Sequence, residues 1–122
     1  MSRTIVWSWP VLLVVTMIPL IALGQTDSMN DEIDYLIGSV GKGGCTFIRN
    51  GNKYTGINAR AHLKSKRRRN AHFIDSTEEF IEKIASQSAT SGKPYVIRCK
   101  GEREQNAGDW LNTLLAQRRN RY

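Results

Sequence analysis

The fold is decided by the stretch Cys45-Thr46-Phe47-Ile48-Arg49-Asn50-Gly51-Asn52-Lys53-Tyr54. Asn50-Gly51 between two apolar runs is a strong hairpin signal, because a type I′ turn needs positive φ at both central residues. Asn tolerates that conformation and Gly adopts it freely. Strand alternation places Phe47 and Arg49 on one face of the ribbon and Ile48 on the other. Both faces are partly apolar, and an isolated hairpin is marginally stable in water, so other elements are expected to pack on it.

The chain contains two cysteines, Cys45 and Cys99. In an exported protein they predict one disulfide, whose loop of about fifty residues stabilises the fold by roughly 4 kcal/mol on the chain-entropy model. A metal site is not expected, because two cysteines without a Cys-x-x-Cys pair or a second nearby histidine lack the usual ligand spacing. If the disulfide forms, the strand that ends at Cys99 lies beside the strand that begins at Cys45.

The N-terminal residues have the pattern of a secretory signal peptide. Arg3 gives a small positive region, and an apolar run over 11–23 follows it. Ala22 and Gly24 are small residues at the −3 and −1 positions, so cleavage is expected before Gln25. An uncleaved membrane anchor is the alternative, because the apolar run is nearly long enough to span a thin bilayer.

This pattern divides the chain into a signal peptide, 1–24, and one small domain, 25–122, in the periplasm or secreted. Removing Arg3 from the 18 Lys and Arg residues leaves 17 against 11 Asp and Glu, a net charge of +6. A basic domain favours anionic partners. Nucleic acid is not expected, because export keeps the chain from the genome.

Helical patterns flank the hairpin on both sides. Apolar residues recur at helical spacing before it, after Ser28 or Asn30 as the cap. The remaining expected elements, in chain order, are a helix over about 59–68 capped by Asn58, a helix opened by a capping box at Ser76-Thr77-Glu78-Glu79, a strand over 95–99, a polar loop over 100–105, and a last helix capped by Asn106. The sequence therefore predicts an α+β domain: a small three-stranded, mainly antiparallel sheet, made of the hairpin and one later strand, packed with about four helices.

Five ordered blocks resemble a known family. They are Phe47-Ile48-Arg49-Asn50-Gly51, Ala59 with His62-Leu63 and Lys66, Phe80-Ile81 with Ala85-Ser86, Ser91-Gly92-Lys93-Pro94-Tyr95, and Trp110-Leu111. The set is similar to a family of small exported bacterial proteins known only as a domain of unknown function. The resemblance covers nearly all of the chain after the signal segment. It implies export and a single small domain, and it implies no established activity or catalytic residue.

One candidate site joins the hairpin to the helix that follows it. Arg49, His62 and Lys66 could form a pocket for an anionic group, with Arg making bidentate contacts and Lys supplying a point charge. The structural alternative has His62 hydrogen-bonded to the hairpin backbone and Lys66 extended across an apolar edge. Neither His62 nor His72, the second histidine of the chain, has a clear carboxylate close in sequence that could orient it as a general base.

A second candidate is the basic surface formed by Lys64, Arg67, Arg68 and Arg69. It could contact anionic lipid or acidic polymer through charge attraction. A solvated helix C-terminus that complements the helix dipole accounts for the same residues.

The functional prediction is a non-enzymatic, exported binding or accessory module of the envelope with an anionic partner and no cofactor or metal. The alternative is a small hydrolase or transferase that uses His62 with Arg49 and Lys66. A third hypothesis is a stability factor for another envelope protein. The sequence does not identify the partner or the oligomeric state.

Overall fold

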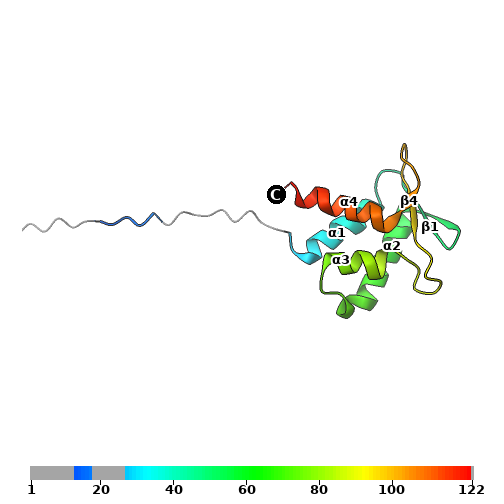
Figure 1. Ribbon diagram of the computed structural model, residues 1–122, viewed down its shortest axis with the longest axis horizontal. Helices are drawn as coiled ribbons and strands as arrows, with labels where there is room; N and C mark the ends of the chain where they lie inside the picture. The colour runs from blue at the N-terminus through cyan, green and yellow to red at the C-terminus, as the bar shows by residue number, and fades with distance from the viewer. Residues whose placement is uncertain (1–12, 18–26, 122) are drawn as a thin grey trace, which may run out of the picture.

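The structure is a computed structural model that describes residues 13–17 and 27–121. The expected cleavage site before Gln25, and most of the expected signal peptide, lie outside these residues. Within the described ranges, no helix is both long and apolar enough to cross a membrane. All the helices and strands reported below lie in the second range (Figure 1).

Helix α1 spans Met29–Val40 and begins where its side chains can cap it. The Ser28 hydroxyl accepts a hydrogen bond from the Asp31 N–H at 3.1 Å, and the Asp31 carboxylate accepts one from the Ser28 N–H at 3.3 Å. This reciprocal pair satisfies two amides of the first turn that have no partner within the helix. The cap is therefore Ser28, the first of the two predicted residues.

The hairpin forms as the sequence predicts. Strand β1 spans Thr46–Arg49 and β2 spans Asn52–Thr55, and the two pair antiparallel. Both turn residues have positive φ, 51° at Asn50 and 78° at Gly51. This is the backbone that a type I′ turn requires.

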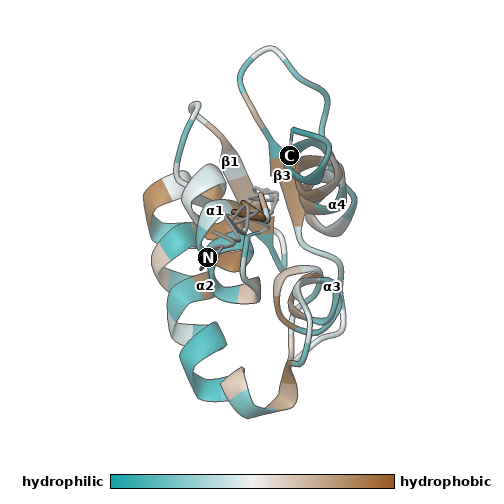
Figure 2. Ribbon diagram, turned by 90° about the vertical axis from the view of Figure 1, so that its left-hand side faces the viewer, coloured by the Kyte–Doolittle hydropathy of each residue, from teal (hydrophilic) through white to brown (hydrophobic). Residues whose placement is uncertain are grey.

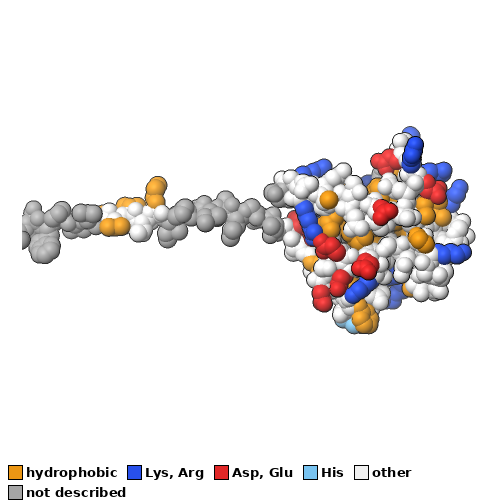
Figure 3. All heavy atoms as spheres, in the orientation of Figure 1, with side chains coloured by type: hydrophobic (Ala, Val, Ile, Leu, Met, Phe, Trp, Pro, Cys, Tyr) orange, Lys and Arg blue, Asp and Glu red, His pale blue; other side chains and the backbone are white. Residues whose placement is uncertain are grey.

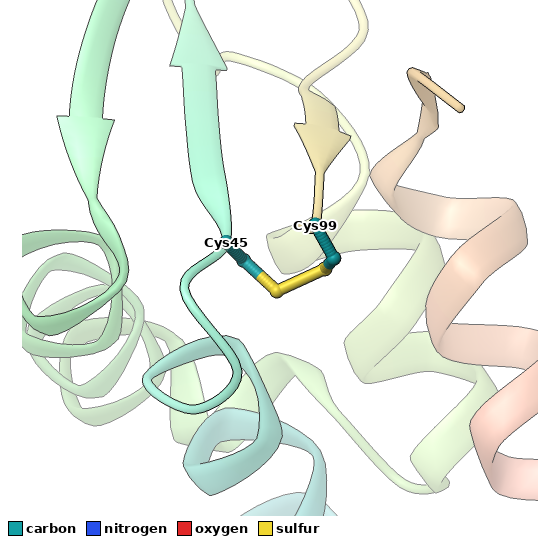
Figure 4. The surroundings of a disulfide bond; sticks show 2 residues. All are labelled: Cys45 and Cys99. Carbon is teal, nitrogen blue, oxygen red and sulfur yellow. A yellow bond between two sulfur atoms is a disulfide. The ribbon is translucent and has the colours of Figure 1, made fainter. Parts of the chain in front are cut away.

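Strand β3, Val96–Arg98, pairs antiparallel with β1 and places Ile97 opposite Phe47. Extending this register beyond the strand ends places Cys99 opposite Cys45, and the two form the predicted disulfide, with Cα atoms 3.8 Å apart. The bridge joins the start of β1 to the end of β3 (Figure 4). The prediction that the third strand neighbours the first is confirmed.

The sheet in the described residues has four strands, so the predicted three-stranded sheet is wrong. The added strand, β4, is Gln105–Asn106, and it pairs antiparallel with β3 to give the order β2-β1-β3-β4. The sequence analysis placed Gln105 in a polar loop, because two polar residues show neither alternation nor β-branched character. The Ala107 N–H donates to the Tyr95 carbonyl at 2.8 Å and extends this pairing to the start of the last helix.

Helix α2, Gly56–Asn70, follows β2 without a loop. It is longer at both ends than predicted, and its cap is Thr55, not Asn58: the Thr55 hydroxyl accepts from the Asn58 N–H at 3.2 Å. Gly56 permits the close approach to the end of α1, because a Cβ there would lie 2.6 Å from the Val40 carbonyl oxygen. The start of α2 and the end of α1 thereby lie against each other.

The second half of the chain is built from shorter helices. The capping box is displaced by one residue: the Ser76 hydroxyl accepts from the Glu79 N–H at 3.1 Å, but the Glu79 carboxylate accepts from the Asp75 N–H at 2.8 Å. Asn106 precedes the last helix, but its side chain makes no capping hydrogen bond. The elements are the 3₁₀ turn η1 (Ala71–Phe73), helix α3 (Thr77–Phe80), the π-helical segment η2 (Ile81–Ala85) and helix α4 (Ala107–Arg119).

The sheet lies at one end of the helices (Figure 1). Figure 2 shows α2 along one side of the molecule and α3 and α4 along the other. The core between them includes the fully buried rings of Phe47, Phe80 and Tyr95. Tyr95 enters this core directly before β3, on the side where α2 packs against β1 and η2.

The C-terminal end of α4 is fixed by an ion-pair network. Arg119 donates from Nε and Nη2 to the Glu32 carboxylate of α1, at 2.8 and 2.9 Å, and it also pairs with Glu78 of α3. The hydrogen bonds from Arg119 hold the pKa of Glu32 below its ordinary value, against the effect of burial. Arg119 thus ties three helices together.

Candidate anion-binding site

A cavity of about 210 Å³ lies between the hairpin and α2. Arg49, the last residue of β1, and His62, on α2, both line it. The rest of the lining is formed by Phe47, Tyr54, Asn58 and Ala59. The structure therefore brings together two of the three residues that the sequence predicts for an anion site.

Lys66 lies one turn beyond His62 on α2, but its ammonium already donates hydrogen bonds to other groups of the protein. Its Nζ donates to the carbonyl oxygens of Ile84 at 2.8 Å and Gln87 at 3.0 Å, and to the Tyr95 hydroxyl at 3.2 Å. The residue is 6% exposed, so the expectation that it extends across an apolar edge is wrong. Burial, followed by the charges of nearby arginines, lowers the pKa of the Lys66 ammonium. Its main contacts connect α2 to η2 and the segment after it.

Tyr95 forms a cluster with Arg49, His62 and Lys66, but it was not predicted from the sequence as a site residue. Its ring packs on Phe47 with centroids 5.1 Å apart, and meets His62 edge to face at 6.4 Å. Burial raises the pKa of the Tyr95 hydroxyl, while the positive charge of Arg49 and hydrogen bonding between the two side chains oppose that shift. The disulfide gives the signal that could have found it: the register that pairs Cys45 with Cys99 also places Tyr95 opposite Arg49.

Two buried nitrogens, Arg49 Nε and His62 Nε2, have no hydrogen-bond partner among the residues that the structure describes. The predicted structural role for His62, a hydrogen bond to the hairpin backbone, is therefore not made by its Nε2. Burial, and then the charges of Arg49 and Lys66, lower the pKa of His62. This lowered pKa favours the neutral imidazole at pH 7.

The cluster is short of negative charge. Within the described part of the chain, Arg49 makes no ion pair with a carboxylate, and the charges that act on His62 are all positive. The same residues contain no group of three His, Cys, Asp or Glu side chains placed to hold a metal ion. The arrangement is suited to accept an anion and lacks the carboxylate that would orient His62 as a general base.

The predicted basic surface is smaller than its sequence suggests. Arg67 pairs with Asp34 of α1 and donates to Asn30 at 2.9 Å, so it links the first two helices. Lys64, Arg68 and Arg69 remain exposed on α2. By contrast, Figure 3 shows acidic and basic side chains interspersed on the face formed by α1, α3 and α4.

A wider hollow of about 520 Å³ lies beside β2 and the loop before β1. Lys53 is the single charged side chain in its lining, which otherwise contains glycines, threonines and apolar groups. Nothing in that hollow corresponds to the unpaired nitrogens of Arg49 and His62. The smaller cavity is the stronger chemical candidate.

The comparisons with known proteins place the chain in a family. A model of a family of unknown function, DUF5329, matches residues 27–119. The chain belongs to this family. The resemblance seen in the sequence to a bacterial family of unknown function is thereby confirmed.

One relative is the uncharacterized protein YfeK of Salmonella typhimurium, which is 44% identical over 50 residues. The match covers 41% of this chain and 42% of YfeK, so the chain spans less than half the length of that relative. No solved structure matches the chain. The description of the family and the name of the relative assign no ligand and no reaction.

Proposed function

We propose that this protein is a non-enzymatic binding module of the bacterial envelope, and that it takes an anionic group into the cavity between the hairpin and α2. The observation that supports the proposal is the Arg49–His62 pair, which lines a cavity and has buried nitrogens without partners. A buried donor without an acceptor costs about 1–3 kcal/mol. If the two side chains turn toward the cavity when it fills, an anion there would supply the missing acceptors.

The surrounding charges favour the same ligand. The positive charges of Lys66 and Arg69 both act on His62, which lines the cavity. Charges in a partly buried site interact more strongly than charges in water, because the effective dielectric constant is lower. The positive charges around the cavity repel one another, and a bound anion would offset that repulsion. Binding should therefore stabilise the fold.

The disulfide supports the envelope location. Bonds of this kind persist in oxidising compartments and are rare in the cytosol, where thiols are kept reduced. Cys45 and Cys99 are bonded here, and the sequence before residue 25 has the pattern of a signal peptide. Both observations support export to the periplasm or beyond.

A binding function is favoured over a catalytic one because of the contacts that His62 and Lys66 make. The hydrolase or transferase alternative needs Lys66 available to a substrate, but its ammonium already donates to three acceptors. It also needs a carboxylate that orients His62, and in the described part of the chain the charges that act on His62 are all positive. An accessory role for another envelope protein is compatible with the same cavity if that partner supplies the anion.

The test is a titration of the ¹⁵N-labelled protein with sodium phosphate and sodium phenylacetate, each replacing sodium chloride at constant ionic strength. At least one anion should give saturable shifts in the amide resonances of residues 47–62. Arg49→Gln should abolish them, whereas Arg103→Gln, the same charge change in the exposed loop before β4, should not. Shifts that are absent, or equal in both variants, would remove the basis of the proposal.

A further inference from the structure

The shape and the donors of the cavity restrict the anion that it fits. We infer that the cavity selects a carboxylate at the end of a small apolar or aromatic group, in preference to phosphate or sulfate. This inference rests on the proposed function, since it specifies the ligand class of the same cavity.

The walls of the cavity are largely apolar. Phe47, Tyr54 and Ala59 line it beside the two nitrogen-bearing side chains. Its volume of about 210 Å³ exceeds the roughly 150 Å³ of an engineered apolar cavity that binds benzene, and falls below the roughly 300 Å³ at which drug-sized sites begin. The space is suited to one ring or one branched aliphatic group, with a polar end.

The donors match one planar monoanion. The Arg49 guanidinium presents a fork that fits both oxygens of a carboxylate. The lowered pKa of His62 favours its neutral form, whose ring can add one N–H donor if it turns toward the ligand. Lys66 does not add a free donor, because three acceptors already surround its ammonium.

A tetrahedral dianion fits the cavity less well. Phosphate would bring a second charge and further oxygens, which would face Phe47 and Ala59 without hydrogen-bond partners. Leaving polar atoms desolvated and unpaired is unfavourable. A carboxylate with an apolar body satisfies the donors and also removes apolar surface from water.

Two sources can present this chemistry: a free small organic acid, or the C-terminal residue of a protein whose last side chain is apolar. Both place a carboxylate next to a ring or a branched chain. They differ in the adjoining peptide bond, so a free acid and a short peptide distinguish them.

The experiment is isothermal titration calorimetry at pH 7 and constant ionic strength. The probes are sodium phenylacetate, sodium acetate, phenylacetamide and sodium phosphate. Phenylacetate should bind at least ten-fold more tightly than each of the other three, because only it combines the charge with the ring. An N-acetylated tripeptide ending in Phe, with a free or an amidated C-terminus, identifies the source: tighter binding of the free-acid peptide than of phenylacetate indicates a protein C-terminus, and weaker binding indicates a small acid.

Variants separate the contribution of the fork from that of charge alone. Arg49→Lys keeps the charge but removes the fork, so it should weaken phenylacetate binding at least ten-fold, while Arg103→Gln should leave the affinity unchanged. Melting curves identify any variant that does not fold, and His62→Gln gives a second test within the cavity, with an expected loss of several-fold.

Three results would overturn the inference. Equal or tighter binding of phosphate, still dependent on Arg49, would refute the carboxylate preference and leave the proposed function intact. If phenylacetamide bound as tightly as phenylacetate, the negative charge would not matter, and both the carboxylate preference and the anionic ligand of the proposed function would be wrong. If no probe binds in a manner that depends on Arg49, both the inference and the proposed function are wrong.

Discussion

Replacing Lys66 with methionine tests whether this residue is structural or a ligand-binding group. The substitution keeps an unbranched side chain of similar length and removes the ammonium that donates to Ile84, Gln87 and Tyr95. Each hydrogen bond from a charged donor contributes about 1.5–3 kcal/mol. The desolvation of the buried ammonium, which costs several kcal/mol, offsets part of that sum.

The expected net loss is about 2–3 kcal/mol, because the Ile84 carbonyl and its neighbours are left without a donor. For a domain of this size, this corresponds to a fall in melting temperature of roughly 10–20 °C. The assay is urea unfolding followed by circular dichroism. Lys64→Met is the matched control, because Lys64 is exposed on the same helix and should change stability by less than about 0.5 kcal/mol.

A Lys66→Met protein as stable as the Lys64→Met control would refute this reasoning. If that stable variant also lost anion binding, Lys66 would be a ligand-binding group, as the sequence first suggested. The structure predicts the opposite pattern: a large loss of stability, with anion binding retained at temperatures where the variant is folded.

Three further predictions concern stability. The double variant Cys45→Ala/Cys99→Ala should lose roughly 4 kcal/mol on the chain-entropy model of its loop, and stability equal to the wild type would show that the bridge does not constrain the unfolded chain. Because the folded-state pKa of His62 is lowered from 6.5, the wild type should lose stability as pH falls below 6.5, and His62→Gln should remove that loss; parallel pH curves would refute the assignment. Arg119→Met should cost about 1–2 kcal/mol, since the guanidinium is partly exposed. The wild-type pair should stabilise the fold above pH 4.5, the ordinary pKa of Glu32, and lose this effect as pH falls through the lowered pKa, so a variant whose acid unfolding matches the wild type would count against it.

The sequence was sufficient for the elements with strong local signals. The Asn50-Gly51 turn, the stripe of α1 and the Cys45–Cys99 bridge follow from short-range backbone preferences, periodicity and composition. Together they placed the third strand beside the hairpin. Local backbone preferences and periodicity were sufficient for the turn and for α1. The bridge was predicted because a chain expected to be exported contains two cysteines.

The parts that were missed depend on tertiary contacts. Gln105–Asn106 is a strand because β3 lies beside it, and its two polar residues show no strand pattern of their own. Lys66 was expected either in the anion pocket or extended across an apolar edge, but the carbonyl oxygens that surround it come from a segment about twenty residues later. Such acceptors have no signature in the sequence around the lysine.

The candidate site was predicted only in part, because some of its features also depend on tertiary contacts. Arg49 and His62 were selected by their residue types and by the short connection between hairpin and helix. Tyr95 required the strand register, and the orphaned nitrogens required the packed structure. Composition predicted an anionic partner, but the small apolar-walled cavity became visible only with the fold.

The most direct test of the central claim is the ¹H–¹⁵N resonance of Arg49 Nε during titration with phenylacetate and, separately, phosphate at constant ionic strength. We expect this resonance to shift saturably with at least one of the two anions and its exchange with water to slow, because the buried N–H gains an acceptor. An Arg49 Nε resonance that neither anion changes, at concentrations that saturate any binding elsewhere on the protein, would contradict the account.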